Sequence, residues 1–190
     1  LDEFDLSYYT YGMSIYKNMP LIEPLETKEV KKIYEFVIVL DTSYSINEEL
    51  AKRFLSNTYT ILSTSNMFYK SCKVHIIQCD DRIRKDDVIS NQNEMDRLLN
   101  SFTLVGGGNT DFRPVFSYVN DLVDQKVFQN LCGLLYFTDG KGTYPKKKPP
   151  YQTAFIFMQE EYEDVDVPPW AVKLIVDAED LDEGEEEHEY

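Results

Sequence analysis

YEFVIVLDTSYS, residues 34–45, joins a nearly unbroken apolar run to a short polar segment. Apolar runs of this length are typical of a central strand in a parallel sheet, because such a strand is buried on both faces. The run stops at Asp41, and the turn that follows can present Ser43 and Ser45 on the same side. The segment therefore predicts a buried strand that brings a carboxylate and two hydroxyls to one edge of a sheet.

Helix and strand patterns alternate along the rest of the chain. Apolar residues recur at spacings of three and four over residues 47–64, which predicts a helix after the first strand. Further helices are expected over 94–100 and 111–125, and further strands over 74–78, 82–89, 131–137, 154–158 and 172–176. The short, charged segment 82–89 is typical of an edge strand. This alternation predicts an α/β fold with a largely parallel sheet.

The last two connections are unusual. Residues 140–153 and 159–171 are rich in proline and short for right-handed crossovers that carry full helices. We expect single helical turns or plain loops there, and a less well covered sheet at this end.

Charge is unevenly distributed along the 190 residues, whose net charge is −15. The segment 179–190 contains eight acidic residues and no Lys or Arg, and we expect it to be a disordered tail. Residues 1–32 are expected to form a short helix and a lead-in segment, which leaves 33–178 as the α/β domain. Without its tail the chain is still mildly acidic, and this argues against nucleic-acid binding, since phosphates call for a basic surface.

The three cysteines, Cys72, Cys79 and Cys132, show no CxxC spacing. Two of them lie in or beside apolar runs, where reduced thiols are usual, so we expect a cytoplasmic protein. No signal peptide is recognised and no apolar run approaches the roughly 20 residues that cross a bilayer, so no membrane partner is expected. Since the chain starts at Leu1 and not at Met, we expect it to be part of a longer protein.

Three polar segments are expected to meet at one edge of the sheet. They are residues 41–45, the glycine-rich turn GGGNTD at 106–111, and Asp139-Gly140 after the apolar strand. In open α/β sheets, ligands gather beyond the carboxyl ends of the strands. The segments offer carboxylates and hydroxyls and no soft donors, which suits a hard cation such as Mg²⁺. Such a shell leaves the ion electrophilic, so that an incoming Glu or Asp can complete it.

These segments resemble the motifs of a known family. DTSYS fits the DxSxS motif of von Willebrand factor type A (VWA) and integrin I-type domains, GGGNT resembles their glycine-rich loop, and FTDG resembles the strand that ends in their fifth metal residue. The resemblance covers roughly residues 33–177. It implies a Rossmann-like VWA fold, with helices on both faces of a mostly parallel sheet and one short antiparallel edge strand.

The resemblance also implies a metal-ion-dependent adhesion site for Mg²⁺, with Mn²⁺ or Ca²⁺ as alternatives. Three hydroxyls would bind the ion, and two carboxylates would bind it directly or through water. The implied site residues are Asp41, Ser43, Ser45, Thr110 and Asp139. The two short connections after residue 139 depart from the family's pattern, but all five site positions are present.

A protein-interaction module, and not an enzyme, is the function that the resemblance implies. The bound ion would grip an acidic residue of a protein partner, and a MoxR-type AAA+ ATPase is the expected kind of partner. More narrowly, the chain resembles the carboxyl-terminal VWA-like domain of bacterial proteins whose amino-terminal half is a metallopeptidase-like domain. That half would be a second partner within the same protein.

Two alternatives to a binding module stay open. A metal-dependent phosphate-ester hydrolase would share the ion but needs a nucleophile or general base beside it. The haloacid dehalogenase pattern would need an Asp where Ser43 stands, and a P-loop would need a Lys after the glycines, where none follows. The other alternative is a structural domain with an empty site.

Several single residues have simpler explanations than metal or catalytic chemistry. Asp111 is expected to cap a helix. The two histidines, His75 and His188, cannot form an HExxH zinc site. Cys132 has no obvious histidine partner for a catalytic thiol. The lysines at 146–148 are expected to form a solvated loop, or alternatively to steer an acidic partner.

Overall fold

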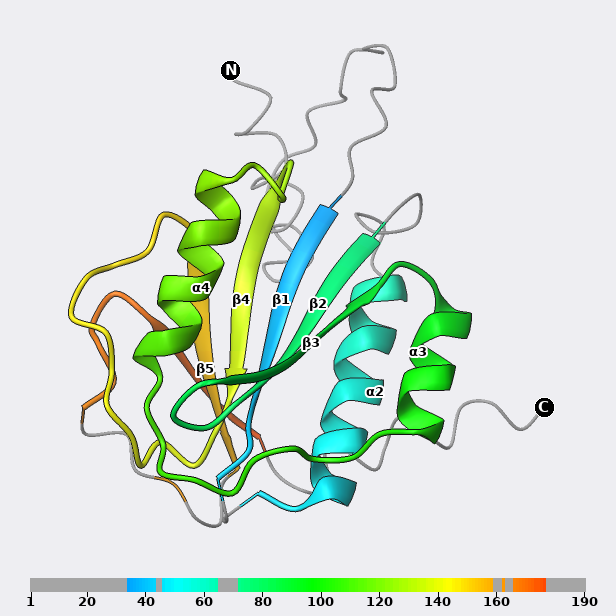
Figure 1. Ribbon diagram of the computed structural model, residues 1–190, viewed down its shortest axis with the longest axis horizontal. Coiled ribbons are helices and arrows are strands. Elements are labelled where there is room, and N and C mark those ends of the chain that lie inside the picture. Colours follow the sequence, from blue (N-terminus) through cyan, green and yellow to red (C-terminus); the bar gives the residue numbers. More distant parts are fainter. Residues whose placement is uncertain (1–33, 44–45, 65–71, 159–161, 163–165, 177–190) are drawn as a thin grey trace, which may run out of the picture. The chain divides into compact units, whose positions relative to one another are not determined.

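The computed structural model describes residues 34–43, 46–64, 72–158, 162 and 166–176 (Figure 1). One sheet contains six strands in the order β3-β2-β1-β4-β5-β6. Neighbouring strands are parallel except for β2 and β3, which are antiparallel. The strands are β1 (Tyr34–Asp41), β2 (Cys72–Cys79), β3 (Ile83–Ile89), β4 (Leu131–Phe137), β5 (Gln152–Met158) and β6 (Val172–Val176). The predicted fold class, a mostly parallel sheet with one antiparallel edge strand, is confirmed.

Helices cover both faces of the sheet. Figure 1 shows α4 (Arg113–Asp124) on one side of the strands, and α2 (Glu48–Thr64) with α3 (Gln92–Asn100) on the other. All described elements begin and end within two residues of the predicted positions. This agreement arises because periodicity and apolar runs are local properties of the chain.

The alternation of side chains along β1 divides the core into two layers. Ile38 and Leu40 belong to the layer that packs with α2 and α3, while Val37 and Val39 belong to the layer that packs with α4. All four side chains are fully buried. A strand buried on both faces needs an apolar residue at every position, which is why this run is continuous.

The sheet is less well covered near β6, as predicted. The described residues of the connections that lead to β5 and β6 contain no helix. Along β6 itself, Val172, Leu174 and Ile175 are exposed. The short connections cannot supply helices to cover these side chains.

Two predicted segments, the short helix within residues 1–32 and the acidic tail from 179, lie outside the described residues. Among the helices that the structure does describe, none has the length and apolar character required to cross a membrane.

Candidate functional site

Asp41 and Asp139 lie at the same edge of the sheet. Asp41 is the last residue of β1, and Asp139 follows the end of β4 by two positions. These strands are parallel neighbours, with Leu40 paired to Phe137. Because parallel strands end at a common edge, the structure brings these two predicted site residues together.

The carboxylate of Asp41 is completely buried and both of its oxygens accept hydrogen bonds. Oδ1 accepts from the backbone N of Ser43 at 2.9 Å, and Oδ2 accepts from Oγ1 of Thr138 at 2.6 Å. Burial raises the pKa of Asp41 above its ordinary value, and the neighbouring Asp139 carboxylate raises it further, while the hydrogen bonds from Thr138 and Ser43 oppose the rise. A cation at this place would offset both the burial and the repulsion.

Asp139 is more accessible than Asp41. Its Oδ1 accepts a hydrogen bond from the backbone N of Lys141 at 3.0 Å, which orients the carboxylate. The ammonium of Lys141 lies 3.7 Å from Oδ2, and the lysine side chain is half exposed. A lysine in this position can move into solvent if a metal takes its place.

The two serines of the DxSxS motif differ in what the structure shows of them. Ser43 contacts Asp41 through its backbone N, and its hydroxyl also lowers the pKa of that carboxylate, so it lies against the site. Ser45 lies outside the described residues, and its place at the site stays a prediction.

Thr110 is brought to the loop that follows Asp139. The next residue, Asp111, forms an isolated parallel bridge with Thr143, and the backbone N of Phe112 donates to O of Thr143 at 3.1 Å. A Cβ on Gly142 would lie 2.7 Å from the methyl group of Thr110. The glycine-rich segment and the segment after β4 are therefore packed against each other.

Asp111 binds Arg113, the first residue of the helix that follows it. Its Oδ1 accepts from the backbone N of Arg113 at 3.0 Å, at the start of α4, and its Oδ2 lies 2.7 Å from Nη2 of the same arginine. These hydrogen bonds lower the pKa of Asp111. The helix begins two residues after the predicted start, and its N-cap residue is Phe112, without a side-chain cap hydrogen bond. Asp111 is therefore not the N-cap that the sequence predicted, although its carboxylate accepts from the first helical N–H.

Three polar residues at this edge were not predicted. Thr138 holds Asp41, while Gln78 and Asp80 at the end of β2 hold the loop that carries Thr110. One signal was available for Asp80, because this residue, like Asp41, comes directly after an apolar strand. For Thr138 and Gln78 the sequence alone offers no comparable signal.

Hydroxyl and carboxylate oxygens make up the donor set at this edge, which fits Mg²⁺ or Mn²⁺ and not a soft metal. Within the described ranges, no three His, Cys, Asp or Glu side chains are grouped so that they could hold a metal. A metal site here would therefore need further oxygen ligands besides the carboxylates, such as hydroxyls or water.

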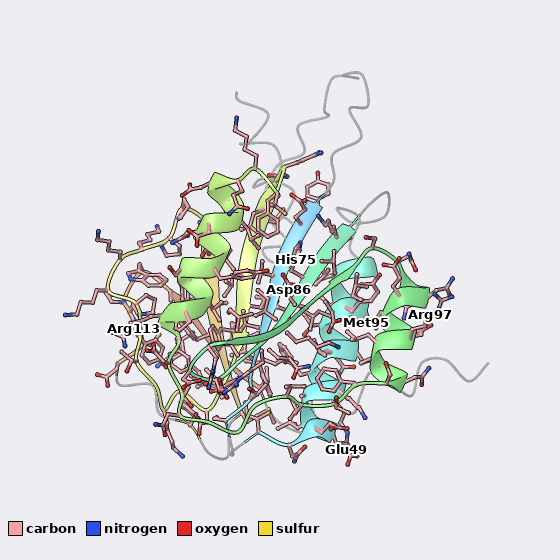
Figure 2. All side chains as sticks on the ribbon, in the orientation of Figure 1. Glu49, His75, Asp86, Met95, Arg97 and Arg113 are labelled. Atoms are coloured by element: carbon pink, nitrogen blue, oxygen red, sulfur yellow. The ribbon has the colours of Figure 1, made fainter. Side chains whose placement is uncertain are left out.

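Nucleophiles and general bases are poorly represented near the site. His75 lies within β2, is 3% exposed and has its Nδ1 3.1 Å from Oδ2 of Asp86. Figure 2 labels both residues. Burial raises the pKa of the thiols, to about 11 for Cys72 and about 12 for Cys79, and raises that of Cys132 as well. Thiols with such pKa values are almost entirely protonated at neutral pH and are weak nucleophiles.

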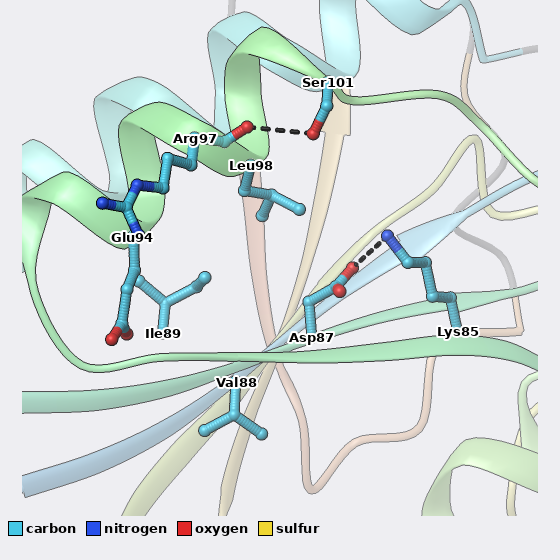
Figure 3. A pocket seen from close by; sticks show the side chains of 8 residues that line it. All are labelled: Lys85, Asp87, Val88, Ile89, Glu94, Arg97, Leu98 and Ser101. Atoms are coloured by element: carbon cyan, nitrogen blue, oxygen red, sulfur yellow. Dashed lines mark hydrogen bonds and ion pairs between the residues drawn. The ribbon is translucent and has the colours of Figure 1, made fainter.

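One shallow depression lies away from this edge, between β3 and α3 (Figure 3). Its lining includes the Lys85–Asp87 ion pair at 2.8 Å, together with Ile89 and Leu98. None of the described site residues lines it. Its open, mixed surface offers no convergent polar groups for a small ligand.

Comparison with known proteins assigns the fold to a family. The family model described as "VWA-like domain (DUF2201)" matches residues 36–177. No protein of curated function shows a significant sequence match.

Among the solved structures that are similar to this chain, two show the shared fold over at least three quarters of its length. Proximal thread matrix protein 1 from the mussel byssus has a TM-score of 0.56 and 14% identity, covering 80% of this chain and 43% of that one. The protein BatB from Bacteroides thetaiotaomicron has a TM-score of 0.52 and 14% identity, covering 76% of this chain and 90% of that one. The chain thus spans less than half the length of the byssus protein. At such identities the likeness concerns the fold alone.

Proposed function

The chain belongs to the VWA-like domain (DUF2201) family, and on this premise we propose that it binds one Mg²⁺ at the edge formed by β1 and β4 and thereby grips an acidic side chain of a protein partner. The observation that supports this most is the pair of carboxylates there. Asp41 and Asp139 come together in a partly buried place, and the pKa of Asp41 is raised by burial and by its neighbour. A divalent cation would relieve both effects.

Each of the five predicted site residues has a proposed role in binding the ion. Ser43, Ser45 and Thr110 would supply hydroxyl ligands, and Asp139 a carboxylate. Asp41 would act directly or through water, since each of its oxygens accepts one hydrogen bond from the protein and keeps a second lone pair. The bound ion would supply an electrophilic position for an incoming carboxylate.

The surroundings favour an acidic partner. The chain is acidic overall, yet the loop that leaves the site carries the exposed residue Lys141 and three consecutive exposed lysines at 146–148. Unlike Lys141, the three lysines at 146–148 make no ion pair with any residue in the described part of the chain. Unpaired cations on a loop that leaves a metal site attract an acidic segment and repel a basic one.

A binding role is favoured over catalysis because, among the residues that the structure describes, no activated nucleophile or general base lies at the site. His75 is buried and paired with Asp86, and the thiols have raised pKa values. The free cysteines of the described region are compatible with a reducing cytoplasm, which is where we place the protein. A MoxR-type ATPase, and a metallopeptidase-like half of the same bacterial protein, are the partners that we propose on the basis of the resemblance.

Thermal melting in the presence of Mg²⁺ or Mn²⁺ tests the site. Ligand binding to the folded state stabilises it by about 2.7 kcal/mol at a hundredfold excess over Kd. We expect a rise of Tm for the wild type and none for Ser43→Ala/Ser45→Ala. The control Ser90→Ala/Ser101→Ala, on the flanks of α3, should respond as the wild type does. Equal responses of all three proteins would refute the proposed ligands.

A further inference from the structure

The loop that carries Thr110 is attached to the end of β2 by a buried amide. Nε2 of Gln78 donates to O of Thr103 at 3.1 Å, and Oε1 of Gln78 accepts from the backbone N of Val105 at 2.7 Å. Gln78 is completely buried. A buried side chain that satisfies one backbone donor and one backbone acceptor fixes the path of the loop at its start.

Asp80 attaches the same loop at two later points. Its Oδ2 accepts from the backbone N of Gly108 at 3.2 Å, and its backbone O accepts from N of Asp111 at 3.0 Å. Thr110 lies between these two attachment points. Asp80 therefore holds the backbone on both sides of Thr110.

An ion pair with Arg84 stabilises the negative charge of Asp80. Nε and Nη2 of this arginine lie 2.8 Å and 2.7 Å from the two carboxylate oxygens, in a bidentate arrangement. Burial alone would raise the pKa of Asp80, but the hydrogen bonds from Arg84 and from the backbone of Asp81 and Arg82 bring it well below its usual range. Asp80 is thus an ionised, completely buried side chain with a fixed orientation.

Two glycines of the loop, Gly106 and Gly108, lie close to the carboxylate of Asp80. A Cβ on Gly108 would lie 3.0 Å from Oδ2 of Asp80, and a Cβ on Gly106 would lie 3.1 Å from the same atom and 2.1 Å from Oγ1 of Thr42. The glycine-rich sequence therefore does more than permit a turn. It lets the backbone approach Asp80 closely enough to bind it.

We propose that Asp80, oriented by Arg84, is a positioning residue that sets Thr110 at the metal site, so that Mg²⁺ affinity depends on an ion pair whose members do not touch the ion. This inference rests on the proposed function. Groups that orient metal ligands typically account for about 10–100-fold in affinity.

A positioning role and a simple field effect predict different results. If the two residues acted only through their charges, removing the positive charge of Arg84 would tighten Mg²⁺ binding, and replacing it by lysine would change nothing. If they position the loop, both changes weaken binding, because neither side chain reproduces the planar two-pronged contact with Asp80.

The experiment compares Mg²⁺ binding by calorimetry for the full chain and three variants, Asp80→Asn, Arg84→Lys and Arg84→Gln. All measurements are made well below the Tm of each protein, so that a loss of global stability alone does not change Kd. The control is Asp87→Asn, which breaks the Lys85–Asp87 pair in the same β2–β3 hairpin but touches no residue of the loop. We expect Kd to rise about tenfold or more in all three variants and to stay unchanged in the control.

Two results would overturn this inference and leave the proposed function standing. One is tighter Mg²⁺ binding by Arg84→Gln, and the other is unchanged Mg²⁺ binding by Arg84→Lys while the wild type binds Mg²⁺. The conservative lysine variant keeps the test decisive even if Asp80→Asn does not fold. Absence of Mg²⁺ binding by the wild type would instead refute the proposed function, and this role of Asp80 would fall with it.

Discussion

Oγ1 of Thr138 lies 2.6 Å from Oδ2 of Asp41, and this buried hydrogen bond joins the carboxyl ends of two neighbouring strands. The same hydroxyl accepts from the backbone N of Gly140 at 3.0 Å, which starts the turn after Asp139. One threonine therefore holds the carboxylate at the end of β1 and shapes the segment that carries the second carboxylate.

Thr138→Val should destabilise the metal-free protein by about 1–3 kcal/mol, since a buried carboxylate oxygen and a backbone N–H lose their partner. Thr138→Ser keeps the hydroxyl and should retain most of the stability. Urea unfolding measures both variants. If valine were tolerated as well as serine, the hydrogen bond would contribute nothing to the site.

Asp41 should make the stability of the metal-free protein fall as pH rises through the acidic range. Its folded-state pKa is raised above the ordinary value of an aspartate, so its stabilising contribution is complete below that ordinary value and is lost as the pH passes the folded-state pKa. The Tm of Asp41→Asn relative to the wild type should therefore increase from pH 3 to pH 7. Saturating Mg²⁺ should reduce this difference, whereas a difference that shrinks with pH would contradict the raised pKa.

Gly142→Ala should destabilise the protein, because the new Cβ would lie 2.7 Å from both the ring of Phe112 and the methyl group of Thr110. Overpacking of this kind costs about 1–3 kcal/mol. Gly133→Ala is the matched control, since the closest atom to its Cβ is at 3.4 Å. The denaturant midpoint of Gly142→Ala should be clearly lower than that of Gly133→Ala. Similar midpoints would show that the loop of Thr110 can move to accommodate the new Cβ.

Replacing the three lysines at 146–148 by glutamate should weaken the Mg²⁺-dependent binding of a hexaglutamate peptide without changing the Mg²⁺-induced rise of Tm. The loss should be large at low ionic strength and small at 1 M salt, where charges are screened beyond about 3 Å. Fluorescence anisotropy of a labelled hexaglutamate peptide measures this binding. A loss that is independent of salt would argue against electrostatic steering by this loop.

Short-range patterns were sufficient to predict the elements. β4 and β6 have the predicted bounds, and the other described elements differ by one or two residues at their ends. The common edge of Asp41 and Asp139 also followed from the sequence, because strands of a parallel sheet end on the same side.

The interactions around Asp80 and Thr138 depended on strand order and loop packing. In the sequence, Asp80 directly follows an apolar strand, as Asp41 does in its own segment, but nothing local indicates that its side chain is buried against Gly106 and Gly108. In the same way, the sequence predicted poor cover at this end of the sheet but did not show which β6 side chains, Leu174 and Ile175 among them, stay exposed. Burial depends on which other segments arrive, and these lie far away along the chain.

The sequence by itself thus determined the helices and strands, the α/β class and the edge where its polar motifs meet, since each follows from residue patterns within one segment or from the common direction of parallel strands. Only the tertiary structure decided which side chains hold Asp41 and the loop of Thr110. Those partners, Thr138 and Asp80, are 97 and 28 residues away from the groups that they bind, Asp41 and the backbone of Gly108. Their hydrogen bonds form only because folding removes the intervening water and fixes both groups at bonding distance.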